Sequence, residues 1–131
     1  MSGFIKEEYP LSALTGKIIG CAMEVHKVLG NGFQERIYQR ALAIEMNLQG
    51  ISYSREHEMD IFYKGNLLGR RRVDFFVEEI IMVELKAVKH MDDGDLAQAI
   101  NYLEAYGVKI GLLINFGDIS LRFHRVMKPK K

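Results

Sequence analysis

The sequence contains a single cysteine among 131 residues. Cys21 cannot form a disulfide within the chain, and a zinc site built from thiolates is excluded within one copy. So little cysteine favours a reducing compartment. No apolar run approaches the length of a membrane-spanning helix, and the first residues lack the apolar region of a signal peptide. These absences predict a soluble, cytoplasmic protein with no membrane partner.

The chain also lacks a strong net charge. Its 18 Lys and Arg residues nearly balance its 17 Asp and Glu residues, which leaves a formal charge of +1. No global field therefore attracts nucleic acid, and any basic contact surface must be local, with Arg70, Arg71 and Arg72 as a candidate. An apolar fraction of 48% and a length of 131 residues are typical of one globular domain, which we expect to span residues 1–131.

Two apolar segments that carry embedded charges occupy residues 70–88. Both are rich in Val, Ile and Phe, and Glu78 and Glu79 separate them, which predicts a β-hairpin. A register symmetric about Glu79 places Asp74 opposite Glu84. Side chains alternate along a strand, so this register predicts one charged and one apolar face. The charged face would hold Arg72, Asp74, Phe76, Met82, Glu84 and Lys86, and the apolar face Val73, Phe75, Val77, Ile81, Val83 and Leu85.

The predicted charged face has an electrostatic cost. Two carboxylates about 5.5 Å apart repel each other by roughly 3 kcal/mol at an effective dielectric constant of about 20. A divalent cation between Asp74 and Glu84 would remove that cost, and Mg²⁺ is commonly held by one or two carboxylates. Alternatively, both acids form a diagonal salt-bridge lattice with Arg72 and Lys86 on a solvated face, which would contribute little to stability. The hairpin alone is compatible with either arrangement.

Helical periodicity precedes the hairpin over residues 11–29 and 33–48. His26 lies toward the buried side of the first helix, as a hydrogen-bonded core residue or as a ligand. Glu35 lies on the apolar stripe of the second helix, either as a favourable charge at the helix N-terminus or as a third acid that reaches Asp74 and Glu84. The stripe itself is predicted to comprise Ile37, Tyr38, Ala41, Leu42, Ile44 and Leu48.

The rest of the chain alternates between strands and one more helix. Strands are predicted over residues 52–63, 108–116 and 119–126, with a turn at residues 64–66. A helix over residues 92–105 places Gln98 and Tyr102 on one side, and the acids that precede it are typical N-caps. Helices and strands in this order predict a layered α/β or α+β domain.

Several stretches resemble the PD-(D/E)XK nuclease superfamily and, within it, the GxxExxY family of small bacterial and archaeal proteins. The motif that names this family is present as Gly32-Phe33-Gln34-Glu35-Arg36-Ile37-Tyr38. The other similar stretches are residues 63–65, 83–88, 97–98, 101–103 and 111–117. Val73 replaces the proline of the superfamily motif, a change that is compatible with a buried strand.

This resemblance implies a restriction-endonuclease-like core, with a mixed β-sheet whose central antiparallel hairpin is flanked by helices. Asp74 matches the motif aspartate, Glu84 the second acid and Lys86 the lysine. Glu35 matches a glutamate of the first helix that some members add to the metal site.

Three further positions resemble elements of certain exonuclease branches. Gln98 and Tyr102 resemble a Gln-x-x-x-Tyr element that lies close to the site and the nucleic-acid backbone in those branches. His26 resembles their upstream histidine ligand, which would add it to Asp74, Glu84 and Glu35 in the metal shell.

The resemblance implies metal-dependent phosphodiester hydrolysis of DNA or RNA with Mg²⁺ or Mn²⁺. Lys86 would orient or deprotonate the attacking water, or stabilise charge on the phosphate, and Arg70 to Arg72 would contact phosphates.

A catalytically silent nucleic-acid-binding or regulatory module of a repair or defence assembly is the first alternative, and an interaction protein with no nuclease role is the second. One minimal domain offers one site, so cleavage of both strands of a duplex would need a homodimer or two encounters.

Overall fold

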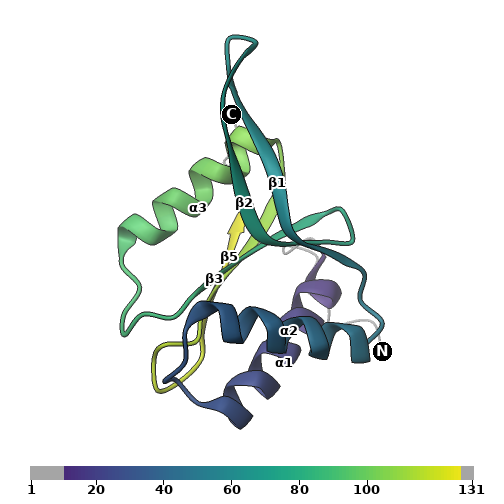
Figure 1. Ribbon diagram of the computed structural model, residues 1–131, viewed down its shortest axis with the longest axis vertical. Coiled ribbons are helices and arrows are strands. Elements are labelled where there is room, and N and C mark those ends of the chain that lie inside the picture. Colours follow the sequence, from purple (N-terminus) through teal and green to yellow (C-terminus); the bar gives the residue numbers. More distant parts are fainter. Residues whose placement is uncertain (1–10, 128–131) are drawn as a thin grey trace.

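The computed structural model describes residues 11–127, which form a five-stranded sheet with helices on both faces (Figure 1). The elements in chain order are α1 (Ser12–Leu29), α2 (Glu35–Leu48), β1 (Tyr53–Tyr63), β2 (Asn66–Val77), β3 (Ile81–Lys86), α3 (Asp93–Tyr106), β4 (Ile110–Asn115) and β5 (Arg122–Met127). The strands lie in sequence order, and only β3 and β4 are parallel, because α3 connects them. The predicted mixed sheet with a central antiparallel hairpin is confirmed.

Two apolar clusters fix the three layers. Helices α1 and α2 pack on one face of the sheet against Phe75, Val83 and Ile114. Helix α3 packs on the other face, where Leu103 and Ala99 meet Met82 and Leu113. Because β3 and β4 are covered on both faces, nearly all of their residues are buried. Among the helices of residues 11–127, none combines the length and apolar character needed to cross a bilayer.

Strands β1 and β2 form a long hairpin whose outer end projects from the rest of the molecule (Figure 1). The predicted turn at residues 64–66 is confirmed, with Lys64 and Gly65 at φ values of 48° and 81°. Glycine adopts such positive φ values without steric cost, which explains its place in this tight connection. At the other end of β2, Glu78 and Glu79 also have positive φ values and lead into β3.

The predicted register between β2 and β3 is confirmed over the three pairs next to the turn, which end at Phe75 and Val83, and the predicted alternation breaks at Asp74. Phe75 pairs with Val83, and Val77 with Ile81. Val73, however, packs in the α3-side cluster, whereas Phe75 packs under α1 and α2. The assignment of Val73 to the same face as Phe75 was therefore wrong. On β1, Arg55 pairs with Phe75 and His57 pairs with Val73. Glu56 between them has a φ of 53°, so β1 is also irregular at this level of the sheet.

The predicted apolar stripe of α2 is half wrong. Tyr38 and Leu42 are buried as expected, and Met46 completes their row. Ile37, Ile44 and Leu48, in contrast, are exposed to solvent. The reason is that α2 carries two adjoining apolar rows, and sequence periodicity does not tell which of them faces the sheet.

Candidate functional site

Asp74 lies in β2 at the break in alternation, and both of its carboxylate oxygens accept hydrogen bonds. Gln39 Nε2 of α2 donates to Oδ1 over 2.8 Å. The backbone N–H of Leu85 in β3 donates to Oδ2, also over 2.8 Å. The side chain of Asp74 thus binds the β3 backbone directly and is held in one orientation. Each oxygen keeps a further lone pair for another partner.

Glu84 is buried in β3, and one arginine contacts it. Arg71 Nη2 lies 3.1 Å from Glu84 Oε2, and the Arg71 guanidinium carbon lies 4.1 Å from the centre of the Tyr102 ring. Glu84 Oε1, Arg71 Nε and the Tyr106 hydroxyl are buried without a hydrogen-bond partner within residues 11–127. Unpartnered buried polar atoms are rare in folded proteins. Here three of them belong to one small group of neighbouring side chains.

The acids of the site influence one another electrostatically. Burial, and after it the charge of Asp74, raises the pKa of Glu84 to about 7 against the opposing effect of Arg71 and Lys86. The pKa of Glu35 is also raised, first by desolvation and then by Asp74. These effects identify Asp74, Glu84 and Glu35 as one interacting group of carboxylates, because each shift depends on the negative charge of another member.

Helix α3 closes the other side of the site. Its N-cap Asp92 accepts from the Asp95 backbone N–H over 3.0 Å, and Asp95 Oδ2 accepts from the Asp92 N–H over 3.1 Å. The expectation that an acid of this loop caps the helix is therefore confirmed. The other oxygen of Asp95 lies 3.8 Å from Lys86 Nζ. A cavity of only about 10 Å³ remains, lined by Arg71, Glu84, Lys86, Asp95, Gln98, Ala99, Tyr102 and Leu113.

A buried asparagine fixes the end of β3 where Lys86 lies. Asn115 is fully buried, and its amide donates to the Val88 carbonyl over 2.8 Å and accepts from the Val88 N–H over 3.0 Å. The backbone N–H of Phe116 also donates to the Lys86 carbonyl. These bonds hold the segment after Lys86 against the end of β4, which restricts where the lysine side chain can reach.

The Gly32–Tyr38 segment positions Glu35. Tyr38 is buried, stacks on Phe116 with ring centres 4.6 Å apart, and donates to the Gly30 carbonyl over 2.6 Å. Its hydroxyl also accepts from the Phe33 N–H over 3.1 Å. The tyrosine thereby ties the loop between α1 and α2 to the core. Glu35 is the first residue of α2, and its carboxylate interacts electrostatically with Asp74 and Lys86.

His26 contacts a different part of the chain. Its Nε2 donates to the carbonyl of Asp118 over 3.0 Å, and its ring lies 6.3 Å from that of Phe116. This is the arrangement of a hydrogen-bonded core histidine, the structural alternative that the sequence left open. A role as a metal ligand stays a prediction.

The three consecutive arginines have different surroundings. Arg70 pairs with Asp60 over 2.9 Å, and Arg72 lies near Glu56 and Glu58, so both belong to the exposed hairpin. Only Arg71 reaches Glu84. The expectation that Arg72 shares a face with Glu84 was therefore wrong, because the break at Asp74 shifts the alternation by one residue.

Sequence reasoning missed Gln39, and it named Arg71 only as a phosphate contact and not as the partner of Glu84. Gln39 follows Glu35 by one helical turn, so the spacing on α2 was the available signal. For Arg71 no such signal existed, because an unbroken strand would turn it away from Glu84.

The donor set fits a hard divalent cation. Asp74, Glu84 and Glu35 offer carboxylate oxygens, which Mg²⁺ and Mn²⁺ prefer, and Glu84 Oε1 is buried without a partner. Within residues 11–127, however, no three His, Cys, Asp or Glu side chains already converge to metal-binding distance. A cation would have to compete with Arg71 for Glu84 and draw the carboxylates together.

Comparison with known proteins identifies relatives of the fold. The family model of the PD-(D/E)XK nuclease superfamily matches residues 12–126. The crystal structure of SSO0001 is similar with a TM-score of 0.56 and 18% sequence identity over 73% of this chain. That likeness concerns the fold, and the chain spans 50% of SSO0001. No curated protein matches the chain.

The raised pKa of Glu84 predicts a pH-dependent free energy of unfolding. Between its ordinary value of 4.5 and about 7, the folded state binds the proton more tightly than the unfolded state does. Stability from this group is therefore present at low pH and lost as the pH rises toward 7, by up to about 3 kcal/mol. Urea unfolding in EDTA should show that Glu84→Gln gains stability relative to the wild type between pH 5 and pH 8.

The exposed turn residue Glu79 provides the control, since Glu79→Gln should follow the wild type at every pH. Parallel pH profiles for Glu84→Gln and the wild type would contradict a buried acid with a raised pKa.

Proposed function

Because the chain belongs to the PD-(D/E)XK nuclease superfamily, we propose that it is a nuclease that hydrolyses phosphodiester bonds, with DNA as substrate and Mg²⁺ or Mn²⁺ as cofactor. The observation that carries the proposal is the placement of Asp74 and Glu84 on adjacent central strands, where the charge of Asp74 contributes to the raised pKa of Glu84. Lys86, two residues after Glu84, lies at the same end of β3.

We also assign the chain to the GxxExxY family. The glutamate and tyrosine of the motif have separate tasks that explain their spacing: Tyr38 anchors the loop before α2, and Glu35 begins the helix beside Asp74. A motif that fixes an acid next to the site in this way is consistent with a catalytic function.

The roles of the residues follow from their chemistry. Asp74 and Glu84, with Glu35, would hold the metal, which when bound supplies Lewis-acid stabilisation of the phosphate and lowers the pKa of water. Gln39 and the Leu85 N–H keep the Asp74 carboxylate oriented. Lys86 would stabilise negative charge on the phosphate or position the water.

Substrate contacts would come from both sides of the site. Gln98 and Tyr102 line the cavity next to Lys86, from which they could contact the nucleic-acid backbone. Arg70 and Arg72 form exposed ion pairs on the hairpin, and such pairs are weak enough to be exchanged for phosphate contacts. These contacts would position a strand without reading its sequence.

One observation favours a catalytically silent module as the second candidate. Arg71 neutralises Glu84 and stacks on Tyr102, which leaves a cavity of about 10 Å³. An arginine that stays in this position would fill the place of the cation and preserve the fold without cleavage.

Cleavage assays test the proposal directly. With Mg²⁺ or Mn²⁺, the protein should cleave at least one substrate among single-stranded, duplex and branched DNA and RNA. Asp74→Ala and Glu84→Ala should each lower the rate by about 100-fold or more, because each removes charge at the reacting phosphate. Glu58→Ala, which removes an exposed hairpin acid, should retain activity. Equal activity in the Asp74→Ala variant would refute the proposed site.

Metal titration separates the two candidate functions. If a cation displaces Arg71 from Glu84, calorimetry should show that Arg71→Gln binds Mn²⁺ more tightly than the wild type. The gain should be about tenfold if the ion pair between Arg71 and Glu84 is worth about 1.4 kcal/mol. Arg70→Gln, in which the neighbouring arginine loses only its exposed pair with Asp60, should bind as the wild type does. If the wild type, Arg71→Gln and Arg70→Gln all fail to bind Mn²⁺, the result would favour the catalytically silent module.

A further inference from the structure

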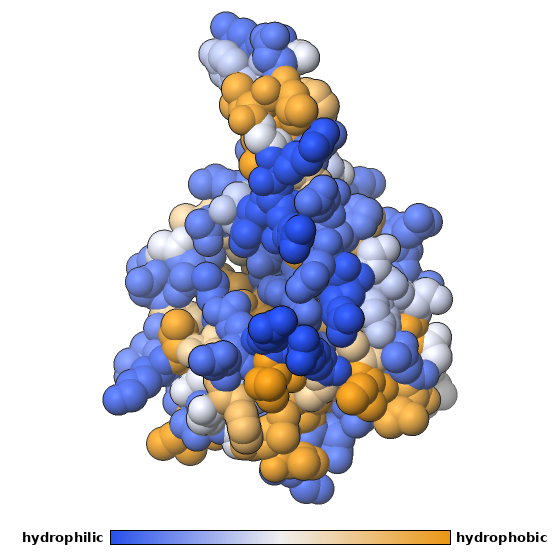
Figure 2. Space-filling view, viewed as in Figure 1, coloured by the Kyte–Doolittle hydropathy of each residue, from blue (hydrophilic) through white to orange (hydrophobic). Residues whose placement is uncertain are grey.

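The outer side of α2 exposes a row of apolar side chains. Ile37, Ala41, Ile44 and Leu48 follow one another at intervals of four, three and four residues, the spacing of a helix that packs against another helix. Ile44 and Leu48 are 59% and 72% exposed, and Ile37 is 37% exposed. In Figure 2, hydrophobic residues gather over the lower part of the molecule, where Figure 1 places α2.

This row adjoins the side of α2 that belongs to the core, and its smallest member, Ala41, is partly buried against the core cluster. Tyr38, Leu42 and Met46 are fully buried against the sheet layer, on average more than about 100° further round the helix. A helix whose apolar residues extend beyond the side that faces the core is typically packed on the additional side too. Within residues 11–127, Ile44 and Leu48 of the outer row stay more than half exposed.

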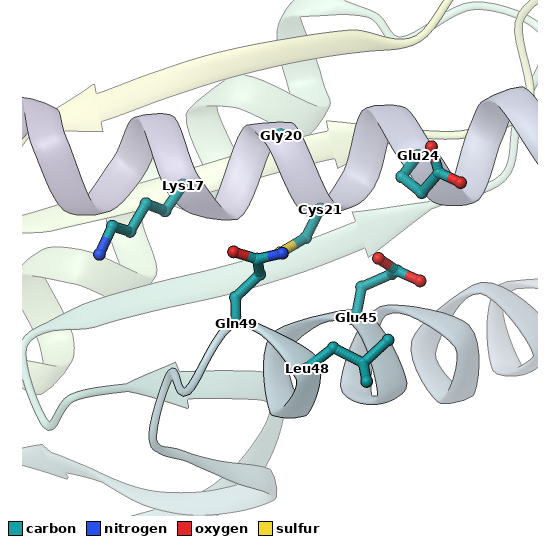
Figure 3. A pocket seen from close by; sticks show the side chains of 7 residues that line it. All are labelled: Lys17, Gly20, Cys21, Glu24, Glu45, Leu48 and Gln49. Atoms are coloured by element: carbon teal, nitrogen blue, oxygen red, sulfur yellow. The ribbon is translucent and has the colours of Figure 1, made fainter.

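Opposite charges flank the outer row. At about 100° per residue, Arg40 lies on one side of Ile44 and Glu45 on the other. Neither side chain forms an ion pair within residues 11–127. Glu45 lines an open groove of about 610 Å³ between α1 and α2, together with Glu24 and Leu48 (Figure 3). Lys17 lies at the opposite end of this groove from Glu24, so the part next to Leu48 is acidic.

We infer that this row is the interface with a second copy of the chain, in which the two α2 helices pair in parallel about a two-fold axis. In parallel helix pairs, a residue on one edge meets the residue five positions later on the facing edge of the partner. That rule places Arg40 of each copy against Glu45 of the other. An antiparallel pair would instead bring like edges together. The small Ala41 allows the helices to approach closely.

The acidic edge also disfavours the other occupants of such a surface. A helix that lies on an anionic membrane surface typically has Lys and Arg residues along its polar face. A face with one basic and one acidic edge is complementary to itself, which is the requirement for a two-fold interface. The dimer would supply two sites, but its formation does not depend on catalysis.

Sedimentation equilibrium tests the interface. The wild type should have twice the 15.0 kDa mass of one chain, and Ile44→Asp should be monomeric at the same concentration. Ile119→Asp changes an even more exposed apolar residue outside α2 and should remain dimeric. Circular dichroism and thermal unfolding would establish that each variant is folded. A monomeric wild type at about 100 μM, or a dimer unaffected by Ile44→Asp, would overturn the inference.

Charge reversal tests the orientation of the two helices. Arg40→Glu and Glu45→Arg should each weaken association by about tenfold or more, because each places like charges across the interface. An equimolar mixture of the two variants should form mixed dimers, because both charge contacts between the two different chains are then between opposite charges. Failure of the mixture to associate better than either variant alone would contradict the parallel arrangement.

Asp74→Ala should dimerise as the wild type does, which separates this result from the proposed nuclease function.

Discussion

Two carboxylates on neighbouring central strands impose the electrostatic constraint on which the site depends. Asp74 is accommodated by hydrogen bonds from Gln39 and from the Leu85 backbone. Within residues 11–127, Glu84 accepts from Arg71 at one oxygen and has no partner at the other, and burial together with Asp74 raises its pKa to about 7. Arg71 offsets part of this cost from the same strand as Asp74. The break in strand alternation makes this possible, because it turns Arg71 rather than Arg72 toward Glu84.

The same constraint connects the fold to the proposed chemistry. A buried carboxylate that attracts an arginine will also attract a divalent cation, so Glu84 can serve as an ion-pair partner or as a metal ligand. Tyr102 supports Arg71 by stacking, and Asp95 combines a helix-capping bond with an ion pair to Lys86. Helix α3 is therefore part of the site and a structural cover for the sheet. The ion pair between Arg71 and Glu84 stabilises the metal-free protein, and a bound cation has to replace it. A stronger ion pair is therefore expected to lower the affinity for metal.

Local patterns in the sequence were sufficient to predict the central hairpin, the pairing next to its turn and an acidic N-cap for α3, because turn residues and strand periodicity act over short distances. The Arg71 contact could not be predicted, since it depends on the break in alternation at Asp74, which strand periodicity does not show. The role of Gln39 depends on how α2 packs on the sheet. The two apolar rows of α2 show the same limit, because either row satisfies helical periodicity.

Diffraction from crystals soaked in Mn²⁺ tests the central claim most directly, because the anomalous signal locates the ion without reference to activity. The account predicts a peak between the carboxylates of Asp74 and Glu84, with the Arg71 guanidinium moved away from Glu84. A fully occupied Arg71 to Glu84 ion pair at saturating Mn²⁺, with no anomalous peak at either carboxylate, would contradict it.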